Sequence, residues 1–166
     1  MKNYIFPILV LLVLLGIGCK KDNQDNVTGI TATKDGSNWT ASNFGTGFKP
    51  LATKDTLFIR ADNNEEHLII ALKQKGEGIY QPIDITRFYI TLGLDVLVST
   101  YELDNTANNL VTLTTYNEGT HQLKGTFALT FKNTMTNNGY PDKIVLGSGK
   151  INISLTDVYM NPYIPK

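Results

Sequence analysis

Apolar and polar residues alternate with a period of two along most of the chain after position 28. The alternation is clearest over 123–131, where apolar residues or glycine hold the odd positions and Lys, Thr or Ala the even ones. It recurs over 57–62, 111–116 and 150–156. Successive side chains of a strand point to opposite faces of a sheet, so each segment is predicted to be a β-strand with one face in the core.

Turn residues separate these strands at short intervals. Asp35-Gly36 predicts a tight hairpin, because both residues accept the positive φ that such a turn needs. The run 68–72 is apolar at every position and predicts a strand covered on both faces. The longest loop is expected over 134–142, and no window has a helical stripe. The fold prediction is all-β: a single antiparallel β-sandwich over residues 28–166.

A different pattern occupies the start of the chain. Lys2 precedes an apolar run of 13 residues, 5–17, that is interrupted by one proline and one glycine. A run of this length suits the core of a secretory signal peptide, whereas a membrane-spanning helix needs about 20 residues. Residues 1–18 are therefore predicted to be a signal peptide. The polar stretch 19–27 is predicted to be a tether.

The end of this leader resembles the lipobox of bacterial lipoproteins. The resemblance covers Gly16-Ile17-Gly18-Cys19, with Ile17 where that family usually has a small residue. It implies that the Cys19 thiol carries diacylglycerol and palmitate-type acyl chains, and that the leader is cut before Cys19. It implies a lipoprotein anchored to a membrane of the cell envelope, with the outer membrane expected, on its periplasmic or surface face. A cleaved signal with an unmodified cysteine and an uncleaved signal anchor are the alternatives.

A second resemblance covers most of the remaining chain. Residues 30–41, with Asp35-Gly36 and then Trp39 and Ala41, look like the opening of a group of uncharacterised Bacteroidota envelope lipoproteins. Gly78-Ile79-Tyr80 and Gly125-Thr126-Phe127 resemble later landmarks of the same group. The resemblance implies an all-β domain of unknown function and brings no catalytic residue.

Composition restricts the chemistry. Fifteen basic and fifteen acidic residues give a net charge of zero, so no nucleic-acid partner is expected. Cys19 is the one cysteine, which excludes an intramolecular disulfide. His67 and His121 are the only histidines, too few for a zinc site that needs three or four ligands. Neither a metal nor a cofactor is predicted.

Two classes of function remain. A hydrolase acting on glycans could use the carboxylates of Glu102 and Asp104, which alternate onto one face of a strand end. The chain has no Gly-x-Ser-x-Gly elbow for a serine nucleophile. The favoured class is a non-catalytic module that binds a glycan, a peptide or a partner protein of the envelope. Phe58 and Tyr116 fall on otherwise polar strand faces and are the predicted binding residues.

Overall fold

The computed structural model describes residues 28–49, 53–73, 76–93, 96–135, 137–156, 158 and 160. These residues form eleven β-strands and no helix. The strands are β1 (Gly29–Lys34), β2 (Ser37–Thr40), β3 (Asn43–Lys49), β4 (Thr56–Asn63), β5 (Glu66–Lys73), β6 (Gly78–Tyr80), β7 (Arg87–Leu92), β8 (Val96–Leu103), β9 (Leu110–Asn117), β10 (Gln122–Asn133) and β11 (Lys143–Ser154). The predicted leader and tether, with Cys19, lie outside the described residues.

All the described strands belong to one antiparallel sheet. Its order is β2-β1-β11-β10-β8-β7-β5-β4-β3, and β9 pairs with β10 and with the short β6. The predicted all-β antiparallel class is confirmed. The predicted sandwich is not confirmed, because a sandwich has two separate sheets, whereas hydrogen bonds here join all the described strands into one sheet.

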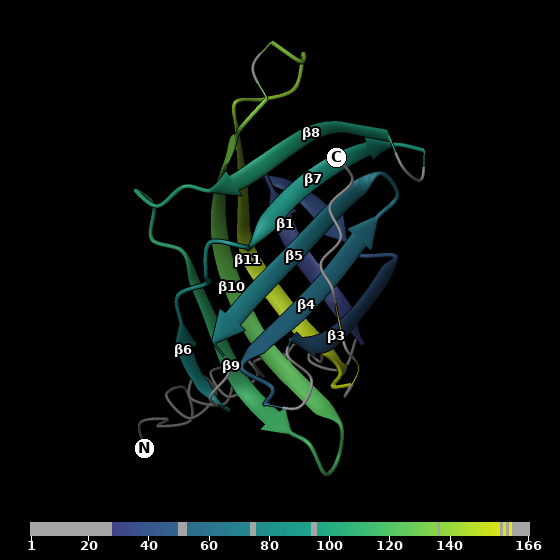
Figure 1. The fold of residues 1–166 in the computed structure, drawn as a ribbon, viewed down its shortest axis with the longest axis vertical. Coiled ribbons are helices and arrows are strands. Elements are labelled where there is room, and N and C mark those ends of the chain that lie inside the picture. Colours follow the sequence, from purple (N-terminus) through teal and green to yellow (C-terminus); the bar gives the residue numbers. More distant parts are fainter. Residues whose placement is uncertain are drawn as a thin grey trace, which may run out of the picture.

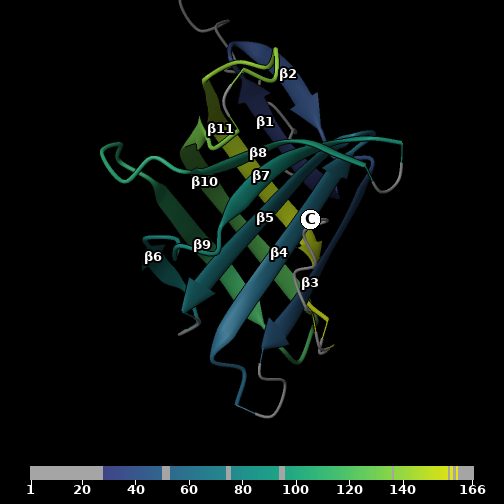
Figure 2. The same cartoon turned by 45° about the horizontal axis from the view of Figure 1, so that its top comes forward.

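This sheet bends strongly, so that its two halves face each other. β3, β4, β5 and β7 lie across β1, β10 and β11 in both views (Figures 1 and 2). The main core fills the space between the halves, and its largest side chains include Phe48, Phe88, Tyr101 and Phe131, all 0% exposed. Each strand of this bent sheet has one face toward the main core and one face away from it. The alternating pattern is therefore the same as that of a two-layered sandwich.

The predicted strand faces and turns agree with the structure where the alternation is regular. Apolar residues at the odd positions of β10 are buried: Leu123, Phe127, Leu129 and Phe131. Asp35 and Gly36 form the tight turn between β1 and β2, with φ of +50° and +85°. The longest described connection runs from β10 to β11, as expected for 134–142.

The edge of β3 is joined to the chain that follows β11 by side-chain and backbone hydrogen bonds. Thr156 donates its backbone N–H to Thr46 Oγ1 (2.7 Å), and its own hydroxyl donates to the Thr46 carbonyl (2.7 Å). Beyond this point Phe48 N–H donates to the Val158 carbonyl (2.9 Å), and Met160 N–H donates to the Phe48 carbonyl (3.2 Å). Thr156, Val158 and Met160 thus cover the edge of β3, which would otherwise expose unpaired backbone groups.

A second, smaller apolar cluster lies on the outer face of β4, β5 and β7. Its buried members are Phe58, Ile69, Ala71 and Tyr89, and Ile83, Leu97 and Met160 pack against it. The run 68–72 in β5 is therefore covered on both faces, as its sequence predicts: the side chains of Leu68, Ile70 and Leu72 enter the main core.

Candidate functional site

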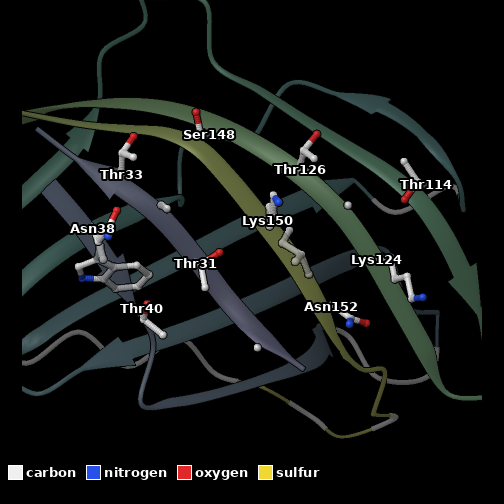
Figure 3. A pocket seen from close by; sticks show the side chains of 15 residues that line it. Thr31, Thr33, Asn38, Thr40, Thr114, Lys124, Thr126, Ser148, Lys150 and Asn152 are labelled. Carbon is white, nitrogen blue, oxygen red and sulfur yellow. The ribbon is translucent and has the colours of Figure 1, made fainter. Parts of the chain in front are cut away.

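A groove of about 640 Å³ lies on the outer face of β1, β2, β9, β10 and β11. Figure 3 shows the side chains that project from these strands into it. The labelled lining residues are polar: Thr31, Thr33, Asn38, Thr40, Thr114, Lys124, Thr126, Ser148, Lys150 and Asn152. The groove is open to solvent along the sheet.

Two β-bulges border the groove. In β11 the register shifts around Ser148, which has a φ of +48°. In β9 it shifts around Thr114, because Leu113 pairs with Gly125 while Thr115 pairs with Lys124. A bulge places an extra residue in one strand and bends the sheet locally. Both extra residues, Ser148 and Thr114, line the groove, so the irregularities that bend the sheet also add hydroxyls to this surface.

The lining residues form an ordered row across four strands. Thr40 pairs with Thr31, Thr31 pairs with Lys150, and Lys150 pairs with Thr126. Directly paired residues of an antiparallel sheet point to the same face. With neighbouring strands about 4.8 Å apart, this row spans roughly 14 Å. It crosses the strands and presents hydrogen-bonding groups at regular intervals.

Five of these polar side chains have no partner within the described part of the protein. Thr33 donates its hydroxyl to the Gly147 carbonyl (2.9 Å). Among the described residues the hydroxyls of Thr31, Thr40 and Thr126 have no hydrogen-bond partner, and neither Lys124 nor Lys150 has a carboxylate within ion-pair distance. These groups are therefore available to a ligand.

Trp39 borders the groove but offers no aromatic surface to it. Its ring is 2% exposed, and its Nε1–H donates to Glu66 Oε2 (2.8 Å), which also pairs with Lys34. The groove lining therefore offers hydrogen-bonding and charged groups but no aromatic face on which a ligand could stack.

Phe58, one of the two predicted binding residues, is buried. The prediction that its ring lies on the outer face of β4 is correct, but the expected exposure is wrong, because the ring is 0% exposed. The outer apolar cluster covers it with Ile83 and Met160. No ligand can contact this ring directly in the structure.

Tyr116, the other predicted binding residue, lies on the opposite face from the one expected. It pairs with Leu123, a core residue, and its half-buried ring packs against the main core. The Thr114 bulge causes this change, since one extra residue exchanges the faces of all residues that follow. Its hydroxyl donates to Glu118 Oε1 (3.0 Å). Tyr116 and Phe58 therefore do not form a shared surface.

The carboxylates of the hydrolase alternative are both held by cations. Glu102 pairs with Arg87 (3.1 Å), and Asp104 pairs with Lys132 (2.9 Å). Hydrogen bonds from the Thr106 hydroxyl and from Lys132 lower the pKa of Asp104 to about 2. A general acid of a glycosidase needs a raised pKa, so this carboxylate is unsuited to that role.

A carboxylate, an imidazole and a hydroxyl also lie in series on the outer face. His67 Nδ1 is 2.8 Å from Asp62 Oδ1, and its Nε2 is 3.0 Å from Thr91 Oγ1. This is the order of contacts in a hydrolase triad. However, Thr91 is 1% exposed, and its hydroxyl donates to the Gly93 carbonyl (2.9 Å). A hydroxyl without solvent contact cannot attack a substrate, so the series is structural.

The carboxylates of the turn 62–66 do not point toward a common position where a metal ion could bind. Asp62 contacts Arg60 and His67, Glu65 accepts from Gly93 N–H, and Glu66 contacts Lys34 and Trp39. Over the described ranges, no three His, Cys, Asp or Glu side chains gather as they would around a metal ion. Nor does the described part of the chain contain a helix long and apolar enough to cross a membrane.

Comparison of the chain with protein-family models, with curated proteins and with solved structures finds no match in any of the three. The groove therefore has to be interpreted from its own geometry and chemistry.

The sequence interpretation missed the groove, although a signal for it is present. Buried residues in β11 change from even positions, Ile144 and Leu146, to odd positions, Ile151 and Ile153. The switch falls at Gly147-Ser148-Gly149, and glycine within a strand often marks a bulge. A change of parity between two alternating runs is thus a visible sign of a bulge.

Proposed function

We propose that this chain is a lipid-anchored protein of the cell envelope, with the outer membrane as the expected site, and that its folded domain is a non-catalytic binding module for a glycan. The observation that carries the binding proposal is the groove, an open surface of polar side chains. Among the described residues, the hydroxyls of Thr31, Thr40 and Thr126 and the ammonium groups of Lys124 and Lys150 have no partner. A sugar chain offers hydroxyls along its whole length, and such a surface can hydrogen-bond them in series.

The leader supports the envelope part of this proposal. An apolar run of signal-peptide length ends at a small residue followed by the single cysteine, Cys19. Lipid chains contribute about 0.8 kcal/mol per buried methylene, and stable anchoring needs more than one chain or a second signal. The motif over 30–41 adds a resemblance to Bacteroidota envelope lipoproteins, and Trp39 and Ala41 within it are buried.

The first experiment tests the binding module with the full chain purified in detergent. The protein is applied to a glycan array, with detergent alone as the blank, and the glycans that bind are titrated by calorimetry. Thr31→Val and Thr126→Val remove groove hydroxyls without changing side-chain volume. Each is expected to weaken binding by about 0.5–1.5 kcal/mol, the usual net contribution of one hydrogen bond.

Thr130→Val is the matched control, because Thr130 lies on the same strand as Thr126 but outside the groove lining. If both groove variants bind as the wild type does, the groove is not the site. Turnover of a glycan that is lost when Glu102 is changed to Gln would establish the hydrolase instead.

The second experiment tests the anchor. Cys19→Ser should move the protein from the detergent phase to the aqueous phase on phase separation, or leave an uncleaved precursor, because serine cannot carry a thioether-linked lipid. A Cys19→Ser protein that partitions and matures like the wild type would show that the anchor is not at this residue.

A further inference from the structure

The charge of the groove differs from that of the whole chain. The sequence has equal numbers of acidic and basic residues. The groove lining contains Lys124 and Lys150 but no Asp or Glu. Acidic side chains elsewhere on the sheet are often paired, as Asp62 is with Arg60 and Asp104 with Lys132. Within the described residues the two groove lysines lack such a partner.

The register places the two lysines close to each other. Lys150 pairs with Thr126 and Lys124 pairs with Asn152, so the lysines are diagonal neighbours on β10 and β11. Diagonal neighbours of an antiparallel pair are about 7–8 Å apart. Lysines on neighbouring positions of this kind concentrate positive charge on one part of the groove, and a bound anion would reduce their mutual repulsion.

Threonines flank Lys150 on both neighbouring strands. Thr31 and Thr126 are the direct neighbours of Lys150 on β1 and β10. Figure 3 shows both threonines projecting on the same side of the sheet as the lysines. The groove therefore places positive charge at its centre and neutral hydrogen-bonding groups on either side.

We infer that the ligand is an anionic glycan, one whose sugars carry carboxylate or sulfate groups. In this arrangement Lys124 and Lys150 pair with the acidic substituents, and the row from Thr40 to Thr126 hydrogen-bonds the sugar hydroxyls. The inference rests on the proposed glycan-binding function and adds the charge class of the ligand to it.

The test uses three polymers with one backbone: neutral dextran, carboxymethyl-dextran and dextran sulfate. A fourth probe, poly-glutamate, carries carboxylates without sugar. The full chain in detergent is titrated with each at low and at moderate salt. We expect the protein to bind at least one charged dextran with much higher affinity than neutral dextran or poly-glutamate. This affinity should fall as the salt concentration rises. The two charged dextrans distinguish a carboxylated ligand from a sulfated one.

Lys124→Gln and Lys150→Gln then remove the charges and keep much of the side-chain length. The double variant is expected to lose roughly three- to tenfold in affinity and part of the salt dependence, as for two solvent-exposed ion pairs. Lys143→Gln is the control, because Lys143 is an exposed residue of β11 outside the groove. It should bind like the wild type, and circular dichroism should show the same strand content for all variants.

The possible failures are distinguishable. Equal binding of dextran and the charged dextrans, unaffected by the lysine variants, would overturn the anionic ligand and leave the glycan function in place. Binding of poly-glutamate as tight as that of carboxymethyl-dextran would overturn both, since charge alone would then be recognised. Binding of none of the four polymers, with no glycan found on the array, would also overturn both.

Discussion

The ring of Phe127 lies directly against Gly149 on the neighbouring strand, and a Cβ added to Gly149 would be 2.5 Å from Phe127 Cδ2. The two residues are paired in the register of β10 and β11, immediately beside the Ser148 bulge. Glycine at 149 thus gives the buried ring its place in the core. The bulge that bends the outer face into a groove is linked to core packing at this point.

Gly149→Ala is expected to destabilise the fold by about 1–3 kcal/mol, because the buried ring or the backbone must move to admit the new methyl group. Urea unfolding followed by circular dichroism measures the change. Gly45→Ala is the control, since a Cβ at Gly45 meets nothing within 4 Å. Phe127→Leu combined with Gly149→Ala should recover part of the loss, and strict additivity of the two changes would contradict the contact.

Phe127→Ala is expected to cost about 3–5 kcal/mol, because the ring is 3% exposed and its removal leaves a cavity in the main core. Thr126→Ala, at the adjacent position on the outer face, should cost less than about 1 kcal/mol, as surface substitutions usually do. Both free energies of unfolding come from the same denaturant titration. Equal losses would mean that the two faces of β10 are assigned wrongly.

Gly47→Ala should detach the C-terminal residues from β3. A Cβ at Gly47 would be 2.5 Å from Met160 Cβ and 2.9 Å from the Val158 carbonyl oxygen. Detachment exposes the edge of β3 and uncovers part of the cluster around Phe58. We expect increased binding of a hydrophobic dye and concentration-dependent association by ultracentrifugation.

Truncation after Thr156 should have the same effect as Gly47→Ala, whereas Gly45→Ala on the same strand should have none. A truncated chain that stays monomeric and binds no more dye than the wild type would show that the edge is protected in another way.

The interaction of Asp104 with Lys132 and Thr106 predicts a specific acid sensitivity. The folded-state pKa of Asp104, about 2, is below its ordinary value of 3.8. The stabilisation is therefore complete above pH 4 and is lost as the pH falls from about 4 to 2. Thermal unfolding over this range should show a smaller decrease for Asp104→Asn than for the wild type.

Lys132→Met should also flatten this part of the pH profile, because Lys132 holds the carboxylate in its charged form. Lys143→Met should leave it unchanged. An Asp104→Asn protein that loses stability in parallel with the wild type from pH 4 to 2 would contradict the lowered pKa.

The strands could be predicted from sequence because alternation reports burial directly, and β10 follows it without interruption over 123–131. That the strands form one continuous sheet could not be predicted, since periodicity shows which face of a strand is buried but not which strands pair with its edges. Tyr116 shows a second limit. The Thr114 bulge moves it to the core face, and local propensity carries little sign of a single extra residue in a threonine-rich strand.

Phe58 shows a third limit. Its position in the alternation correctly gives the outer face, but its burial depends on Ile83 and Met160, which are distant in sequence. The groove combines all of these difficulties, because it needs two bulges and residues from five strands. The polar character of its side chains and the change of parity at Gly147-Ser148-Gly149 are the two signs of it in the sequence.

The pairing of β1 with β11 determines when during synthesis the sheet can be completed. Thr33 on β1 bonds to Gly147 on β11, 114 positions further along the chain. The sheet therefore cannot be completed until nearly the whole chain has been synthesised, and folds with such distant contacts form slowly. A chain that stays unfolded until its end emerges remains suitable for threading through a secretion channel. Under the proposed export by residues 1–18, the groove, which needs strands from both ends of the described chain, would form only after the chain has crossed the membrane.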